Sequence, residues 1–148
     1  MTNRICGSFL QMKGWQIFKK KVGIHGDLKI GNLTDFAIGD HCGISQRFNI
    51  LDHHRIEIGS RLALSARCML IDAGLDKTQF AISNFLRHLS ALIINKDGAW
   101  IGEGSILLAN VNVGRRAIVG AVAFVTRHVL DHAIAAGKPA QVIGSTNE

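Results

Sequence analysis

Cysteine side chains can act as nucleophiles or metal ligands. The spacing of the cysteines in this 148-residue chain argues against both roles. The three cysteines, Cys6, Cys42 and Cys68, are odd in number and show no CxxC spacing. Cys42 and Cys68 also occupy the small position of a repeat described below. We therefore expect buried, inert thiols and no bound metal.

A run of cations near the amino terminus suggests a second kind of site. Lys19, Lys20 and Lys21 lie beside Trp15 and Phe18, a combination that could form a nucleic-acid-binding patch. The formal net charge of +6 also suits a ligand that carries phosphates. The lysines precede the first clear repeat, where a solenoid needs a cap with a polar outer face. We therefore expect these lysines to form a solvated cap, and we expect no nucleic-acid partner. Nucleic-acid binding is the alternative hypothesis.

A six-residue hydrophobic repeat organises the rest of the chain. In its longest run the repeat places an aliphatic residue at every sixth position: Ile101, Leu107, Val113, Val119 and Val125. Shorter runs precede it: Ile24, Ile30 and Phe36; Ile38, Ile44 and Ile50; Ile58, Leu64 and Leu70. The fourth position after each aliphatic is usually small: Thr34, Cys42, Cys68, Ser105, Val111, Ala117, Ala123 and Val129.

This period predicts an all-β solenoid. A helix would need apolar residues three and four apart, and a simple strand would need strict alternation. A six-residue period instead gives one short strand and one turn per repeat, three of which make one coil of a triangular prism. The period slips by two residues between Phe36 and Ile38 and between Ile56 and Ile58, which we expect an enlarged corner turn to absorb.

The composition is that of one compact domain. The chain is 47% hydrophobic, and it shows neither a signal peptide in residues 1–14 nor an apolar run of about 20 residues. We expect a soluble cytoplasmic protein without a membrane partner. The predicted organisation is a cap over residues 1–23, a β-helix over 24–130 and a short carboxy-terminal extension over 131–148. The repeat is interrupted once, so an excursion loop is expected at about 72–94.

The carboxy-terminal half resembles a known family. The matching stretches are residues 98–102 (GAWIG), 111–114 (VNVG), 118–121 (IVGA), 125–127 (VTR) and 136–143 (AGKPAQVI). This ordered series is similar to that of the hexapeptide-repeat acetyltransferases that act on galactosides, maltose, nodulation factors, capsular polysaccharides and xenobiotics. The resemblance extends from about Ile24 onward.

The resemblance implies a left-handed parallel β-helix, a homotrimer, and acetyl transfer from acetyl-coenzyme A at clefts between subunits. It places Trp100 near the reacting centre. It also assigns residues to the coenzyme groove and to the turn over its nucleotide end: Ala121, Thr126, Arg127, Lys138, Pro139 and Ala140. Two positions depart from the pattern, because Val122 replaces a usual glycine and Gln141 replaces a common lysine or arginine. The branched side chain of Val122 could narrow the groove.

The excursion lacks the histidine that the resemblance leads one to expect. Counting forward from Ile58 puts Leu75 at that position, and counting back from Trp100 puts Asp76 there. Acetyl transfer to a hydroxyl needs a base to take its proton. Leucine cannot do this, and an aspartate with a pKa near ~4 is a poor base unless burial raises its pKa.

Other histidines could supply the base. In the segment Asp52, His53 and His54, the resemblance matches Asp52 to an acidic corner that approaches the catalytic position across the trimer cleft. We therefore take His53 and His54, with Asp76, as the candidate catalytic residues. His88 is a weaker candidate, and the remaining histidines are expected on solvated turns: His25, His41, His128 and His132.

The expected function is that of an acetyl-coenzyme A-dependent O-acetyltransferase. Its acceptor would be the hydroxyl of a sugar, a polysaccharide precursor or a small xenobiotic. The alternative is a degenerate trimeric relative that binds a ligand without transferring acetyl groups. Turnover would separate these two functions, and coenzyme A binding would separate both from a binding module of another class.

Overall fold

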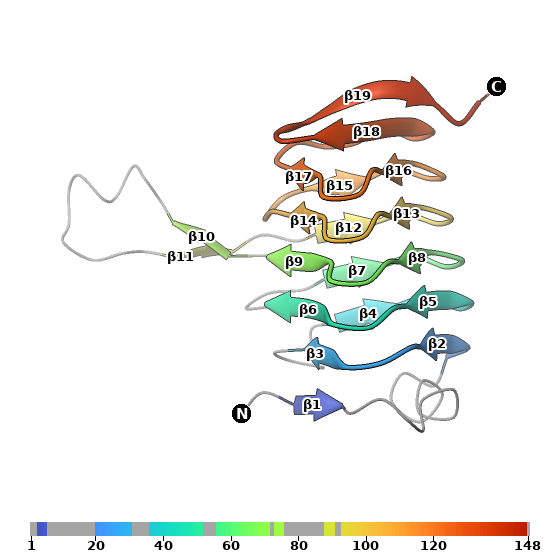
Figure 1. The fold of residues 1–148 in the computed structure, drawn as a ribbon, viewed down its shortest axis with the longest axis vertical. Coiled ribbons are helices and arrows are strands. Elements are labelled where there is room, and N and C mark those ends of the chain that lie inside the picture. The colour runs from blue at the N-terminus through green and yellow to red at the C-terminus, as the bar shows by residue number, and fades with distance from the viewer. Residues whose placement is uncertain are drawn as a thin grey trace.

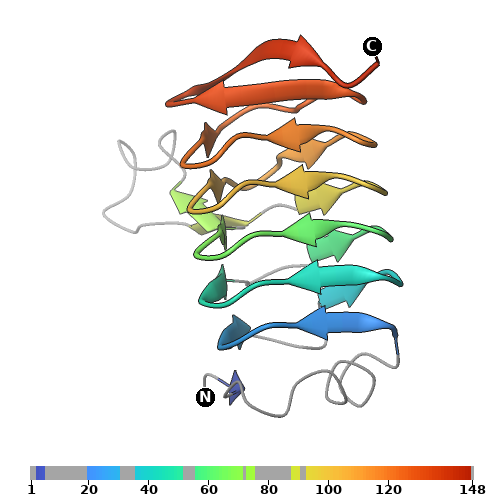
Figure 2. The same cartoon turned by 45° about the vertical axis from the view of Figure 1, so that its right-hand side comes forward.

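The computed structural model describes residues 3–5, 20–30, 36–51, 56–71, 73–75, 88–90 and 93–147. These residues form short strands joined by turns, and the strands stack along one axis into a prism (Figures 1 and 2). None of the described residues belongs to a helix long and apolar enough to cross a membrane.

Three sheets form the faces of the prism, and we call them A, B and C. Sheet A is ordered β1 (Asn3–Ile5), β3 (Leu28–Ile30), β6 (Phe48–Leu51), β9 (Met69–Ile71), β14 (Ile106–Leu107) and β17 (Phe124–Val125). Sheet B is ordered β19 (Ala140–Ser145), β18 (Ala133–Gly137), β16 (Ile118–Val119), β13 (Trp100–Ile101), β8 (Ala63–Leu64), β5 (Cys42–Ile44) and β2 (Val22–Ile24). Sheet C is ordered β15 (Asn112–Val113), β12 (Ile93–Asn95), β7 (Ile56–Ile58) and β4 (Phe36–Ile38). A separate antiparallel pair, β10 (Ala73–Leu75) and β11 (His88–Ser90), projects away from the stack (Figure 1).

The six-residue repeat places two side chains of each strand inside the prism. The aliphatic positions of the longest run are all fully buried: Ile101, Leu107, Val113, Val119 and Val125. The small positions are buried beside them: Cys42, Cys68, Ser105, Val111, Ala117, Ala123 and Val129. Because successive coils pair in parallel and in register, each residue type stacks on its counterpart in the next coil. The predicted all-β, left-handed parallel β-helix is confirmed.

The structure places no corner turn at the two slips of the repeat, between Phe36 and Ile38 and between Ile56 and Ile58. Phe36 and Ile38 both lie inside β4, and Ile56 and Ile58 both lie inside β7, with all four side chains buried. A large residue therefore occupies the position that is small elsewhere. The additional residues of the chain fall earlier, between β3 and β4 and between β6 and β7.

A polar residue explains where the repeat seems to stop. Asn95 occupies an aliphatic position of the core, where its Cα pairs with Ile58 below and Val113 above. Its side chain is fully buried, and its Nδ2 and Oδ1 atoms have no hydrogen-bond partner. The coil that follows the excursion therefore keeps the six-residue register of its neighbours, although it carries Asn95 where the repeat predicts an aliphatic residue.

Antiparallel strands cover both ends of the stack. At the amino-terminal end β1 pairs with β3, and at the carboxy-terminal end β19 folds back on β18 (Figure 1). The predicted domain boundaries at residues 23 and 130 stay predictions. The first coil begins with β2 at Val22, and β18 begins at Ala133.

The buried cysteines should be chemically silent in the folded protein. Cys42 is 3% exposed and Cys68 is fully buried, and burial raises the pKa of each thiol. At pH 8 a raised pKa lowers the thiolate fraction, which is the reactive form. In a Cys6→Ser variant we expect both thiols to react with a disulfide reagent at least ~1,000-fold more slowly than in denaturant, since reaction must await opening. A thiol that titrates rapidly in the native variant would contradict this.

Candidate functional site

Trp100 is the most exposed aromatic side chain of the predicted site. It lies on β13 and faces out of sheet B, with 52% of its surface exposed. Its indole Nε1 donates a hydrogen bond to Ser65 Oγ of the preceding coil at 3.0 Å. This bond restrains the ring, so the indole loses little rotational freedom when a ligand contacts it.

Ala121 and Val122 form the turn between β16 and β17, at the edge where sheet B meets sheet A. Val122 has φ of +58°, in the left-handed region that a β-branched residue rarely adopts. The backbone therefore needs the conformation that favours glycine, which is the residue the resemblance expected at this position. The valine side chain is 52% exposed, so it projects from the edge.

The remaining coenzyme candidates lie at two other places near the carboxy-terminal end. Thr126 and Arg127 follow β17, at the edge where sheet A meets sheet C. Lys138 and Pro139 form the turn between β18 and β19, and Ala140 begins β19. Arg127 and Lys138 are exposed, and neither is paired with a carboxylate of the described residues.

A single chain does not bring the seven coenzyme candidates into one pocket. They occupy sheet B, two different prism edges and the end hairpin. Two clefts, of about 750 and 540 Å³, lie elsewhere among the described residues, and none of the seven lines either of them.

The three predicted catalytic residues, His53, His54 and Asp76, lie outside the described residues. Their places in the chain are still informative. His53 and His54 belong to the segment that joins β6 of sheet A to β7 of sheet C, and the hairpin β10–β11 leaves the prism between β9 of sheet A and β12 of sheet C. Arg127 belongs to another connection between the same two sheets. The topology thus assigns the candidate bases and one coenzyme candidate to the same type of connection.

Strand pairing raises the importance of His88. In the antiparallel pair of β10 and β11, Leu75 and His88 are direct Cα partners. Residues that are opposite in such a pair occupy neighbouring places. The chain therefore has leucine at the position where a histidine was expected, and a histidine across the hairpin from it. Sequence reasoning ranked His88 low because the register of the two hairpin strands cannot be read from the repeat.

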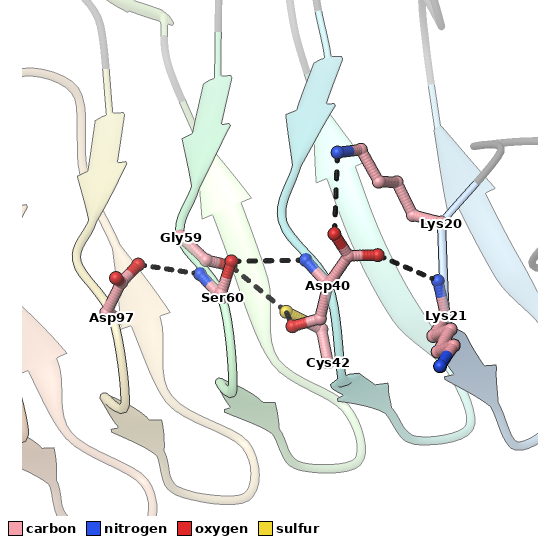
Figure 3. A network of polar contacts seen from close by, with 7 residues as sticks. All are labelled: Lys20, Lys21, Asp40, Cys42, Gly59, Ser60 and Asp97. Atoms are coloured by element: carbon pink, nitrogen blue, oxygen red, sulfur yellow. Dashed lines mark hydrogen bonds and ion pairs between the residues drawn. The ribbon is translucent and has the colours of Figure 1, made fainter.

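Polar side chains form a ladder along the edge where sheet C meets sheet B, which we call the C–B corner (Figure 3). At four coil steps, an oxygen of one side chain accepts a backbone N–H of the preceding coil. The bonds are Lys21 N to Asp40 Oδ1 at 3.2 Å, Asp40 N to Ser60 Oγ at 3.2 Å, Ser60 N to Asp97 Oδ1 at 2.7 Å, and Arg115 N to Asp131 Oδ1 at 2.8 Å. We call this series the acceptor ladder.

The hydrogen bonds of the acceptor ladder also lower the pKa of two of its aspartates. The hydrogen bond from Lys21 N lowers the pKa of Asp40, and the bond from Arg115 N lowers the pKa of Asp131. Nearby Lys20 and Lys96 act in the same direction. Because both pKa values lie below those of an unfolded chain, these aspartates stabilise the fold above pH ~4 and lose that contribution as the pH falls further.

No metal centre is found in the part of the chain that the structure describes, since no three of its histidine, cysteine, aspartate or glutamate side chains come together in a suitable group. The histidines expected on solvated turns are largely there. His25, His41 and His128 are exposed, whereas His132 is half-buried and lies beside Thr146, with 3.4 Å between its Nδ1 and the threonine hydroxyl.

Comparisons with known proteins agree with the family resemblance. No protein-family model matches the chain. It is 27% identical over 112 residues to the galactoside O-acetyltransferase of Lactococcus lactis, an alignment that covers 72% of this chain and 52% of that protein. The chain spans between 18% and 58% of the length of its first curated relatives, which are named as acetyltransferases.

Solved structures show the same fold. A hexapeptide-repeat acetyltransferase of Vibrio cholerae, determined in complex with acetyl-coenzyme A, is 21% identical with a TM-score of 0.75, covering 90% of this chain and 74% of that one. An N-acyltransferase of Bacillus cereus, determined with dTDP and coenzyme A, is 21% identical with a TM-score of 0.68, covering 94% and 91% of the two chains. The relatives thus include both O-acetyl and N-acyl transferases.

Proposed function

We propose that this protein is an acetyl-coenzyme A-dependent acetyltransferase whose acceptor is a hydroxyl of a sugar, a polysaccharide precursor or a small xenobiotic. The observation that carries the proposal is the tethered, half-exposed Trp100, together with the unpaired cations Arg127 and Lys138 in the same carboxy-terminal half of the prism. An indole can pack against an acyl group, and the two cations can neutralise phosphates. Structural neighbours determined with coenzyme A, one of them also with dTDP-4-amino-4,6-dideoxyglucose, support this assignment.

The proposed chemistry divides the work between the bound thioester and the chain. Acetyl-coenzyme A, when bound, supplies the acetyl group in activated form. A histidine from His53, His54 or His88 would take the hydroxyl proton as the acceptor oxygen bonds to the carbonyl carbon. As the carbon–sulfur bond breaks, the same histidine would return that proton to the departing sulfur. Asp76 remains a weaker candidate for the base because its carboxylate is intrinsically a poor one.

Coenzyme A binding offers a direct test. If Arg127 and Lys138 contact the phosphates, coenzyme A at ~100 times its Kd should stabilise the fold by about 2.7 kcal/mol and raise the melting temperature. An Arg127→Ala, Lys138→Ala double variant should lose most of that increase. Arg47→Ala is the matched control, since Arg47 is an exposed arginine on an earlier coil. Equal increases in the parent and the double variant would place the phosphates elsewhere.

Val122 allows the width of the groove to be tested in the same assay. Val122→Gly removes a branched side chain and relieves the positive φ. We therefore expect a higher melting temperature without ligand. A larger increase on adding coenzyme A would show that the valine narrows the groove.

We also propose that the active form is a homotrimer that packs through sheet B. The outward residues of sheet B form one column in register across six coils: Gly23, Gly43, Ala63, Trp100, Ile118 and Ile134. The column carries no charged side chain, unlike that of sheet A, which begins with Lys29. An uncharged face of this kind can be buried against other copies around a three-fold axis. The predicted cytoplasmic location stays a prediction.

Sedimentation velocity tests the trimer. The parent should sediment as a trimer at micromolar concentration, and Ile118→Lys should shift it toward the monomer by burying an unpaired charge. Asn49→Lys is the matched control, because Asn49 faces out of sheet A beside Lys29. A monomeric parent would contradict the proposal.

A second function is favoured by one observation in the sequence. The histidine position of the resemblance holds Leu75 or Asp76. A chain without a competent base would still trimerise and bind a ligand while transferring no acetyl groups. Coenzyme A binding with no turnover on any acceptor would support this degenerate form.

A further inference from the structure

The acceptor ladder is interrupted at one coil. Each member of the ladder is an aspartate or serine that offers an oxygen to the coil below, but the coil between Asp97 and Asp131 offers Arg115. An arginine side chain has donors and no acceptor. The backbone N–H of Asp97 therefore receives no oxygen from the next coil, although the backbone pairing continues through a 3.1 Å bond from Arg116 N to Asp97 O.

Positive charge gathers at the same place. Arg61, Arg115 and Arg116 line one cleft of about 750 Å³ together with Asp97, Gly98 and His132. All three arginines are exposed, and none is paired with a carboxylate of the described residues. The nearby Asp131 is engaged by Lys96 at 3.8 Å and by the N–H of Arg115.

A glycine lies between two arginines in the middle of this cleft. Arg61, Gly98 and Arg116 occupy equivalent left-handed turn positions, with φ of +55°, +71° and +51°. On the coil between the two arginines the position thus carries no side chain. Since neighbouring strands lie about 4.8 Å apart, the two arginine backbones are roughly 10 Å apart. The stem of Arg116 leans over Gly98, since a Cβ built there would lie 3.4 Å from Arg116 Cγ. The absence of a side chain at Gly98 thus lets Arg116 extend toward the coil of Arg61, so that both guanidinium groups can contact one oxyanion.

One carboxylate opposes this charge. Asp97 lines the cleft, but its Oδ1 accepts the N–H of Ser60 at 2.7 Å and is part of the ladder. The cleft lining therefore holds three guanidinium groups and one carboxylate that is already hydrogen-bonded, while Asp131 beside Arg115 is engaged by Lys96 and by the N–H of Arg115. Arginine is also the side chain best suited to bind phosphate oxygens in pairs.

We propose that the C–B corner binds a phosphate-ester group, with one phosphate oxygen accepting the N–H of Asp97 and the guanidinium groups of Arg61, Arg115 and Arg116 neutralising its charge. The bound oxygen takes the place that a carboxylate oxygen holds at the other coils. None of the seven coenzyme candidates lines this cleft, so a phosphate bound here is held by residues other than those proposed above for coenzyme A. The phosphate belongs either to a phosphorylated second ligand or to coenzyme A itself.

Pyrophosphate binding measured by calorimetry at low ionic strength tests the site without requiring acetyl transfer. The parent should bind pyrophosphate, and an Arg61→Gln, Arg116→Gln double variant should bind it at least tenfold more weakly. Arg47→Gln is the matched control, because Arg47 also sits in a left-handed turn, with φ of +56°, but on the edge between sheets B and A. Affinity should also fall as salt is added.

Arg115→Asp gives a second, independent variant. It restores the missing acceptor, so it should leave the chain folded or raise its melting temperature while abolishing pyrophosphate binding. Unchanged pyrophosphate affinity in both the double variant and Arg115→Asp, or an equal loss in Arg47→Gln, would overturn the proposal.

Coenzyme A distinguishes the two sources of the phosphate. If coenzyme A competes with pyrophosphate and binds the double variant at least tenfold more weakly, the site holds the phosphates of coenzyme A. If coenzyme A binds the double variant as it binds the parent while pyrophosphate binding is lost, the site holds a separate phosphorylated ligand. Failure of acetyl transfer would leave either result intact.

Discussion

Replacing His53, His54 and His88 together by alanine is expected to lower acetyl transfer by about 10²–10⁴, with coenzyme A binding retained. The hydroxyl proton needs an acceptor, and neither Leu75 nor Asp76 is a competent base in water. The topology assigns these three histidines to the A–C edge and its hairpin. His128 lies on the same edge and is kept, because its Nδ1 already accepts the N–H of Asn112 at 3.1 Å. Turnover should be measured on sugar, chloramphenicol and streptogramin acceptors.

Single variants assign the base to one histidine. Loss confined to His53→Ala or His54→Ala would support a base on the segment between β6 and β7, and loss confined to His88→Ala would support the hairpin. His25→Ala is the matched control, because His25 is an exposed histidine on a different edge. Full activity in the triple variant would refute His53, His54 and His88 as the base.

Introducing a histidine at position 75 or 76 distinguishes a chain whose catalytic base lies elsewhere from a chain that has lost its base. If the parent shows no turnover but Leu75→His or Asp76→His gains it, the chain is a degenerate enzyme with an intact acceptor site. If the parent is active and neither substitution improves it, the base is already supplied elsewhere in the chain.

Gly102→Ala is expected to destabilise the fold by about 1–3 kcal/mol or more, whereas Gly43→Ala should change its stability by less than ~1 kcal/mol. A Cβ on Gly102 would lie 2.5 Å from Val119 O and 2.6 Å from Ala121 N, both backbone atoms of the next coil. A Cβ on Gly43 would meet nothing within 4 Å. Both glycines belong to the coils of sheet B and neither has a positive φ, so the pair compares their contacts with the next coil of the same chain.

Equilibrium denaturation at equal protein concentration measures this difference, since association would otherwise contribute to stability. Equal losses in the two variants would indicate that the coils can separate to admit a side chain. A loss confined to Gly102 would show that the rigid spacing of parallel strands, rather than glycine flexibility, requires this residue.

The sequence alone determined the fold class and much of the core. A strict six-residue period has one common structural interpretation, because the two inward positions of each short strand must match from coil to coil. It also identified Cys42 and Cys68 as interior residues and Val122 as a departure from glycine. These predictions need no knowledge of the tertiary structure, since each depends only on the six-residue period and on the size of one side chain.

Tertiary structure decided how distant residues come together. Only the register of β10 and β11 pairs Leu75 with His88, and only the stacking of coils brings Arg61, Gly98 and Arg116 to one corner although they span 56 positions of the chain. The interruption of the acceptor ladder at Arg115 is likewise invisible without the coil-to-coil hydrogen bonds. The period fixes what lies inside the prism, but outward residues are free of that constraint, and their neighbours depend on turn lengths that no repeat specifies.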